Sequence, residues 1–138
     1  MKIAIINGPN LNLLGKREVD IYGNESFDTY LPVLRDKYPH CVISYFQSNV
    51  EGELVNEIQR VGFDHDGIIF NPGGYTHTSV AIGDAIAAVK TPVIEVHISN
   101  IFGREEFRKL SHVSGKARGV ISGLGLKGYE LALQAFLQ

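Results

Sequence analysis

The stretch KIAIINGPNLNLLGKRE, residues 2–18, joins a short apolar run to a long polar segment rich in Gly and Asn. The run Ile3-Ala4-Ile5-Ile6 stops at Asn7, and the polar segment continues to Tyr22 and Gly23. Loops between strands and helices usually take about 2–6 residues, so this segment is too long to be a mere connection. Ligands of open parallel sheets bind beyond the carboxyl ends of the strands. The stretch therefore predicts a buried first strand whose following loop forms part of a site.

Similar apolar runs recur along the chain and alternate with helix-like segments. Runs that are apolar on both faces are typical of parallel strands covered by helices on both sides. The alternation predicts right-handed crossovers and a flavodoxin-like, doubly wound, five-stranded parallel sheet in a three-layer α/β/α domain spanning residues 1–138. The expected strands are Lys2–Ile6, Val42–Phe46, Gly67–Phe70, Val93–Ile98 and Gly119–Ser122.

Three of the intervening segments have helical patterns: Glu53–Val61, Ser79–Val89 with Ser79 as N-cap, and Lys127–Leu137. The segment Ser26–Tyr38 contains Pro32. A proline inside a helix costs about 3 kcal/mol, so we expect a kink there or a helix that starts nearer the proline.

The composition excludes several classes of function. With 138 residues, 44% hydrophobic and 20% charged, the chain suits one globular domain, and a net charge of −2 argues against nucleic-acid and membrane partners. The single cysteine, Cys41, cannot form an internal disulfide and is expected to be a small buried hydrophobe. The first apolar run is too short for a signal peptide or a membrane span, so we expect a cytoplasmic protein.

Three further polar segments follow strands and should gather with the first at one edge of the sheet. They are Phe46–Asn49, Asn71–Ser79 and Glu95–Asn100. In the second of these, Gly73 and Gly74 precede a helix and could form an anion cradle, with an ordinary loop as an equally good interpretation. The chain has neither a phosphate-binding Gly-x-x-x-x-Gly-Lys-Ser/Thr loop nor the Gly-x-Gly-x-x-Gly dinucleotide pattern.

Glu95 and His97 are two residues apart on an expected strand, so their side chains share one face. A carboxylate beside an imidazole can fix its tautomer and favours its protonated form, which suits a general acid. Arg104 and Arg108 are four residues apart and would share a helix face if that stretch were helical. Two guanidiniums there indicate an anionic or polyhydroxylated ligand, with solvated charge as the alternative.

Tyr22 lies five residues from Arg17 in the first polar loop. An exposed loop tyrosine is usually a packing residue. Lowering its pKa from about 10 to near 7 takes about 4 kcal/mol of phenolate stabilisation, which nearby cations in a water-poor site can supply. Tyr22 is thus a candidate phenolate base. The histidines lack paired ligand spacing and no Cys-x-x-Cys is present, so no metal is expected.

Four motifs, in order along essentially the whole chain, resemble those of the type II 3-dehydroquinases. They are Asn-Gly-Pro-Asn-Leu-Asn-Leu-Leu-Gly-x-Arg with a later Tyr-Gly, Gln-Ser-Asn-x-Glu-Gly, Asn-Pro-Gly-Gly-Tyr-Thr-His-Thr-Ser, and Val-His-Ile-Ser-Asn followed by Arg-Glu-Glu-Phe-Arg. The resemblance implies a flavodoxin-like fold and no metal or organic cofactor. It also implies dehydration of 3-dehydroquinate to 3-dehydroshikimate, in the shikimate pathway of aromatic amino-acid biosynthesis, by anti elimination through an enolate.

The resemblance also implies roles for individual residues. Tyr22 would remove the C2 proton, and Arg17, on a lid, would lower the pKa of that tyrosine. Asn10 would position a water or stabilise the enolate oxygen. His97, oriented by Glu95, would protonate the leaving C1 hydroxyl. The substrate would be held by the backbone amides of Ile98 and Ser99, by Asn71, and through its ring hydroxyls by His77 and Arg108.

Asp84 matches the family position that reaches into a neighbouring subunit's site, which implies a homo-oligomer, usually a dodecamer of four trimers. Val19 stands where many relatives have proline, so we expect a more flexible lid. Phe102-Gly103 and Lys109-Leu110 replace residues that are often polar in relatives and could alter access to the site.

Two other functions compete with the dehydratase. One is a non-catalytic flavodoxin-like module that binds a small anion. The other is a nucleotide or flavin carrier on the same fold, which would purify with a chromophore and which the missing phosphate-loop signature disfavours.

Overall fold

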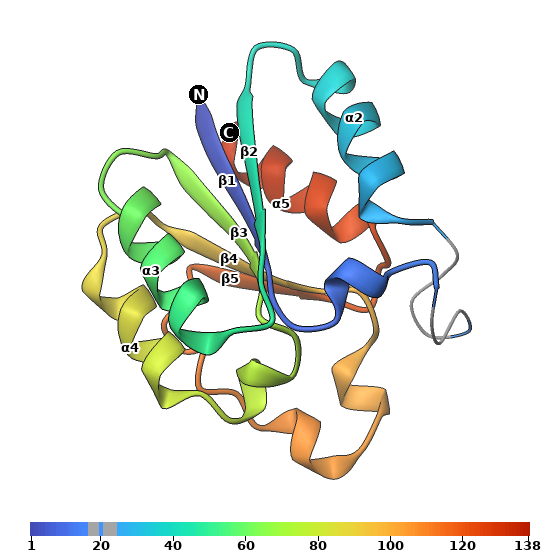
Figure 1. Ribbon diagram of the computed structural model, residues 1–138, viewed down its shortest axis with the longest axis vertical. Helices are drawn as coiled ribbons and strands as arrows, with labels where there is room; N and C mark the ends of the chain where they lie inside the picture. Colours follow the sequence, from blue (N-terminus) through green and yellow to red (C-terminus); the bar gives the residue numbers. More distant parts are fainter. Residues whose placement is uncertain (17–19, 21–24) are drawn as a thin grey trace.

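A computed structural model describes residues 1–16, 20 and 25–138 of the chain, and its centre is a five-stranded sheet (Figure 1). All strand pairs are parallel and the strand order is β2-β1-β3-β4-β5. The strands are β1 (Lys2–Asn7), β2 (Val42–Gln47), β3 (Gly67–Asn71), β4 (Val93–His97) and β5 (Gly119–Ser122). The predicted doubly wound, flavodoxin-like sheet is confirmed.

Helices cover both faces of the sheet. Figure 1 shows α2 (Phe27–Lys37) and α5 (Lys127–Phe136) on one side, and α3 (Glu51–Val61) and α4 (Val80–Ala88) on the other. Short 3-10 turns occupy the carboxyl edge: η1 (Leu11–Leu13), η2 (Gly73–His77), η3 (Ile101–Gly103) and η4 (Glu106–Lys109). Among the described helices, none is long and apolar enough to cross a membrane.

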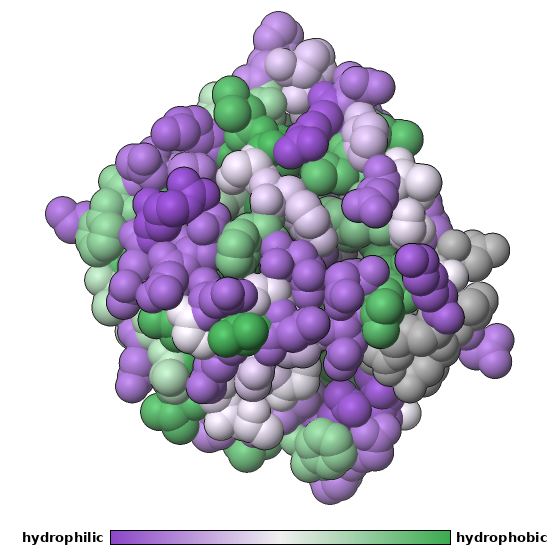
Figure 2. Space-filling view, viewed as in Figure 1, coloured by the Kyte–Doolittle hydropathy of each residue, from purple (hydrophilic) through white to green (hydrophobic). Residues whose placement is uncertain are grey.

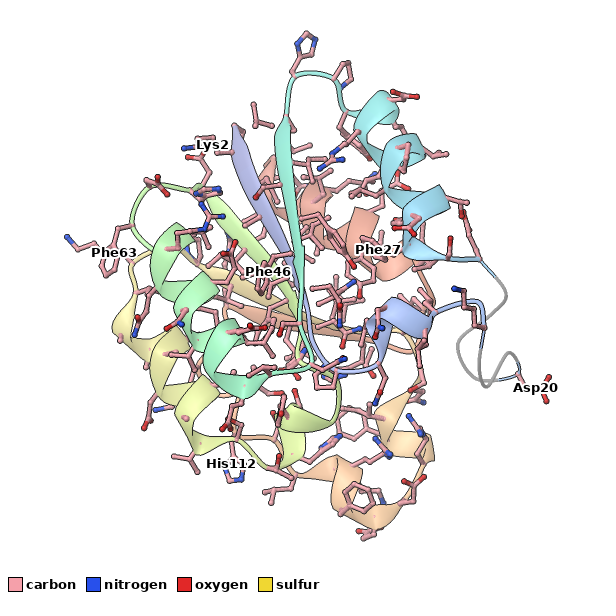
Figure 3. The ribbon with its side chains drawn as sticks, in the orientation of Figure 1. Lys2, Asp20, Phe27, Phe46, Phe63 and His112 are labelled. Atoms are coloured by element: carbon pink, nitrogen blue, oxygen red, sulfur yellow. The ribbon has the colours of Figure 1, made fainter. Side chains whose placement is uncertain are left out.

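Successive strand residues point to opposite faces of the sheet and so divide the core into two clusters. Ile3, Ile5 and Val96 pack with α2 and α5, whereas Ala4, Ile6 and Phe70 pack with α3 and α4. The two clusters place Phe27 on the α2 side and Phe46 on the α3 side of the sheet, as Figure 3 shows. On the outer surface seen in Figure 2, polar side chains predominate and apolar ones form separate patches. At the carboxyl edge of the sheet, side chains from the two faces therefore belong to two separate buried clusters.

The predicted strands agree with the observed ones to within one residue at each end. Ser79 is the N-cap of α4, as expected, because its Oγ accepts a hydrogen bond from the Ile82 N–H at 3.0 Å. Helix α3 begins at Glu51, two residues before its predicted start. Cys41, expected to be buried, is partly exposed and packs at the margin of the α2/α5 core.

Of the two alternatives expected around Pro32, the helix that starts nearer the proline is wrong. Helix α2 begins at Phe27, where Ser26 caps it by accepting from the Thr29 N–H at 3.3 Å, and it runs through the proline to Lys37. Pro32 removes only the donor that would reach the carbonyl of Asp28, an exposed residue whose carbonyl water can satisfy. Burial of Phe27, Leu31 and Leu34 outweighs that loss.

Candidate active site

A pocket of about 180 Å³ opens at the carboxyl edge of the sheet, beyond β1, β3 and β4. Its size suits a ligand smaller than the drug-sized molecules that fill typical pockets of 300–1,000 Å³. The charged or titratable side chains among its described lining residues are Arg104, Arg108, His77 and His97, with no carboxylate among them. This imbalance favours a small anionic ligand.

Behind the pocket wall lies a buried acidic cluster centred on Glu95, which is 0% exposed. Glu95 Oε2 contacts His97 Nε2 and accepts from Thr76 Oγ1 at 2.7 Å, and its Oε1 accepts from Ser114 Oγ at 2.6 Å. Burial raises the pKa of Glu95, but the hydrogen bonds from His97, Ser114 and Thr76 outweigh it and leave the pKa below its usual value. Glu95 is therefore an ionised carboxylate, and it fixes Nε2 of His97 as the donor nitrogen.

A second histidine, His77, stands beside the first, with the two ring centroids 6.4 Å apart. Its Nδ1 donates to the carbonyl oxygen of Leu110 at 2.8 Å, and its ring makes a T-shaped contact with Phe107. Burial lowers the pKa of His77, which the backbone hydrogen bond only partly offsets. His77 is thus a neutral imidazole near pH 7, with Nε2 as a hydrogen-bond acceptor.

On the opposite face of the sheet, a chain of neutral hydrogen bonds leads to the pocket-lining residue Asn71. The Gly73 N–H donates to Asn71 Oδ1 at 3.0 Å, and Asn71 Nδ2 donates to Tyr129 Oη at 2.9 Å. Tyr129 Oη in turn donates to Asn7 Oδ1 at 2.7 Å, and Asn7 Nδ2 donates to Tyr45 Oη at 3.3 Å. The amide of Asn71 is held at both of its ends.

The peptide groups after His97 are oriented by a glycine turn. The N–H of Gly123 donates to the His97 carbonyl at 3.1 Å, and that of Gly125 donates to the Ile98 carbonyl at 3.0 Å. Both glycines have φ in the left-handed region, +91° and +64°. Because a trans peptide is planar, the N–H groups of Ile98 and Ser99 point away from this turn.

The two arginines do not share one α-helix, because Arg104 directly follows η3 in an extended conformation and Arg108 lies within η4. Both nevertheless line the pocket. Arg104 Nη1 donates to Ser99 Oγ at 3.2 Å, and Arg108 Nε donates to Glu105 Oε2 at 2.6 Å. The two guanidinium groups therefore meet at the same pocket because of the η3 and η4 turns, and not because of a four-residue spacing on a helix.

Most of the predicted site residues lie together. Asn10, Asn71, His77, His97, Ile98, Ser99 and Arg108 all line the pocket, with Glu95 directly behind His97. Asp84 is exposed on α4 and does not line the pocket. Arg17, Val19 and Tyr22 are outside the described residues.

The predicted anion cradle is only partly matched by the structure. Gly73 and Gly74 line the pocket. The α4 N-terminus, however, already carries a carboxylate, because Ser79 Oγ donates to Glu51 Oε2 at 2.5 Å.

Sequence reasoning missed Thr76, Ser114 and Tyr129. The hydroxyl of each bonds to a side chain at least 19 positions away along the sequence. Only Thr76 lies within one of the four motifs. Within the part of the chain that the structure describes, no group of three His, Cys, Asp or Glu side chains is placed to hold a metal ion.

A parallel α/β sheet with a cationic pocket backed by a buried carboxylate–histidine pair defines a class of small-molecule enzymes. The family described as Dehydroquinase class II matches residues 1–137, and the chain belongs to this family.

Relatives named 3-dehydroquinate dehydratase are similar over nearly their whole length. The protein of Fusobacterium nucleatum subsp. nucleatum is 55% identical over 96% of this chain and 94% of its own. That of Caldicellulosiruptor saccharolyticus is 53% identical over 97% and 94%. The crystal structure of type II dehydroquinase from Butyrivibrio crossotus superimposes with a TM-score of 0.96 at 46% identity and covers 100% of this chain and 98% of that one.

Proposed function

We propose that the chain dehydrates 3-dehydroquinate by an anti elimination through an enolate, with the acid and the base supplied by different segments of the chain. Family membership makes it a hydro-lyase of the shikimate pathway. The observation that carries the mechanism is the buried Glu95–His97 pair, which faces a pocket whose described lining holds cations and no carboxylate.

His97 is the general acid of this proposal. Its Nε2 is held by Glu95, which leaves Nδ1 to hold the proton that is transferred to the departing C1 hydroxyl. The C1–O bond breaks, its electron pair takes the proton, and water leaves. Glu95 remains ionised throughout, because Thr76 and Ser114 also donate to it.

Tyr22 is the proposed base, and its role rests on the family resemblance. As phenolate it takes the C2 proton, and the electron pair moves onto the C3 oxygen as an enolate before the hydroxyl departs. Arg17 lowers its pKa by favouring the phenolate. Asn10 lines the pocket with φ +71° and would stabilise the enolate oxygen or position a water.

The substrate carboxylate is assigned to the N–H groups of Ile98 and Ser99 together with Asn71. Support comes from the glycine turn, which directs both peptide N–H groups away from itself, and from the pocket position of all three residues. His77 and Arg108 are assigned to the ring hydroxyls, since a neutral imidazole nitrogen accepts and a guanidinium donates.

The proposed enzyme is an oligomer of identical chains. Asp84 is exposed on α4, outside the pocket of its own chain, as a residue serving a neighbouring subunit must be. A homododecamer of four trimers, working in the cytoplasm without a cofactor, is the form we propose.

The test is to add 3-dehydroquinate to the purified protein and to follow the enone absorbance of the product. Product should form at the same rate after exhaustive treatment with chelator. Tyr22→Phe removes the oxygen that accepts the C2 proton and keeps the ring. It should therefore lower kcat at least about a thousandfold. Absence of product from the assembled, unaltered protein would refute the dehydratase assignment, and a normal kcat in Tyr22→Phe would refute the base.

A further inference from the structure

The side chain of Tyr129 is 0% exposed and lies in the first turns of α5, on the face of the sheet opposite His97. Its hydroxyl is nevertheless one hydrogen bond away from the pocket, since it accepts from Asn71 Nδ2 at 2.9 Å. The ring makes a T-shaped contact with Phe27, with centroids 4.9 Å apart. A buried phenol so placed can act on a ligand only through Asn71.

The donor and acceptor pattern of the chain fixes the orientation of the Asn71 amide. A backbone N–H can only donate, so the Gly73 N–H requires Oδ1 of Asn71 on its side. Nδ2 must then face Tyr129, whose single proton is given to Asn7 Oδ1 at 2.7 Å and whose lone pair accepts. Burial raises the pKa of Tyr129, so the phenol keeps its proton.

One of the two Nδ2 hydrogens is used by Tyr129. An amide has two such hydrogens in one plane, so fixing the first fixes the direction of the second. Asn71 lines the pocket, which makes the second hydrogen the one available to a ligand acceptor.

We propose that Tyr129 is a positioning residue for substrate binding, which holds the Asn71 amide so that its second Nδ2 hydrogen meets the substrate carboxylate. This inference rests on the proposed function for the identity of the substrate. The contact exists in both the ground state and the transition state, so its loss raises KM and spares kcat.

The test compares Tyr129→Phe with Tyr45→Phe. Both variants remove one hydroxyl from the same hydrogen-bonded chain, but the Tyr45 hydroxyl accepts from Asn7, whereas the Tyr129 hydroxyl accepts from Asn71. Tyr129→Phe should raise KM about tenfold, equivalent to about 1.4 kcal/mol, with kcat within about twofold. Tyr45→Phe should leave both constants within about twofold while lowering thermal stability. Equal KM values in the two variants, or a fall in kcat without a rise in KM for Tyr129→Phe, would overturn the inference.

A measurement on the unaltered protein covers the case in which Tyr129→Phe does not fold. In its NMR spectrum, one Asn71 side-chain amide hydrogen should exchange slowly with solvent in the free protein. The other should shift when quinate, the alcohol form of the substrate's ketone, is added. Fast exchange of both hydrogens would contradict the role of Tyr129. If the unaltered protein still converts 3-dehydroquinate, such fast exchange would refute the role of Tyr129 and leave the proposed function intact.

Discussion

Two buried polar clusters reach the same pocket from opposite faces of one sheet, and they differ in charge. The Glu95 cluster lies on the α3/α4 face and contains a carboxylate held by His97, Thr76 and Ser114. The Asn71 chain lies on the α2/α5 face and consists of neutral groups, Tyr129 and Asn7 among them. An ionised group can stabilise a histidine that exchanges a proton, whereas a neutral chain can only fix directions. The difference assigns proton transfer to one face and ligand orientation to the other.

The largest expected effect comes from breaking the charged cluster. His97→Ala should lower kcat about a thousandfold, because the leaving hydroxyl loses its proton donor. The matched control is His40→Ala, since His40 is exposed and lies in the turn between α2 and β2. The measurement is the steady-state kcat of both variants with 3-dehydroquinate. Equal kcat values in the two variants would show that His97 is not the acid.

A smaller effect is expected from the turn that orients the peptide groups of Ile98 and Ser99. At Gly125 an added Cβ meets no atom within 4 Å, so Gly125→Ala strains only the backbone, whose φ is +64°. That strain costs about 1–2 kcal/mol of stability, and the shift of the turn that relieves it should appear as a several-fold rise in KM with little change in kcat.

Gly115→Ala is the control for this turn, because its Cβ also meets nothing within 4 Å and its φ is not in the left-handed region. Kinetic constants for the two variants, measured side by side, test whether the turn matters to the ligand. A change in kcat alone for Gly125→Ala would place the turn with the charged cluster.

The smallest effect on catalysis is expected from a third cluster, which joins α2 to α5 away from the pocket. Glu130 accepts from Tyr38 Oη at 2.8 Å and pairs with Lys37 and Lys127. The hydrogen bond from Lys37 and those from Tyr38 and Lys127 lower the pKa of Glu130 to about 2. Glu130→Gln should therefore lower the free energy of unfolding by about 1 kcal/mol at pH 7 and leave kcat and KM unchanged.

The pH dependence of that loss has a definite sign. A carboxyl whose pKa is lower in the folded than in the unfolded state stabilises the protein above its unfolded pKa, near 4.5. The stabilisation fades as the pH falls through about 2. Denaturant titrations should show the two proteins furthest apart above pH 5 and converging below it. A constant difference at every pH would mean that the charge of Glu130 is not what stabilises this contact.

The sequence predicts the sheet well because each strand is a short apolar run bounded by polar residues. It also predicts that Glu95 and His97 share a face, since strand alternation is strictly local. The alternative of a later start for helix α2 fails because the burial of Phe27 and Leu31, a tertiary effect, outweighs the local cost of Pro32.

The supporting hydroxyls show why the rest of the site escapes local reasoning. Tyr129 lies 122 positions from Asn7 and 58 from Asn71, and Ser114 lies 19 from Glu95. A tyrosine in a C-terminal amphipathic helix resembles any core residue. Only the packing of α5 against the sheet, which brings the Tyr129 hydroxyl to Asn7 and Asn71 at the ends of β1 and β3, shows what this oxygen contacts.

The division of labour between the two faces is tested most directly by measuring kcat and KM for Glu95→Gln beside Tyr129→Phe, on the same substrate at pH 7. Glu95→Gln keeps the shape of the side chain and removes its charge. It should lower kcat about a hundredfold with KM within about threefold, whereas Tyr129→Phe should do the reverse, raising KM about tenfold with kcat nearly unchanged. If both variants change the same constant by similar factors, the two clusters do not have separate roles.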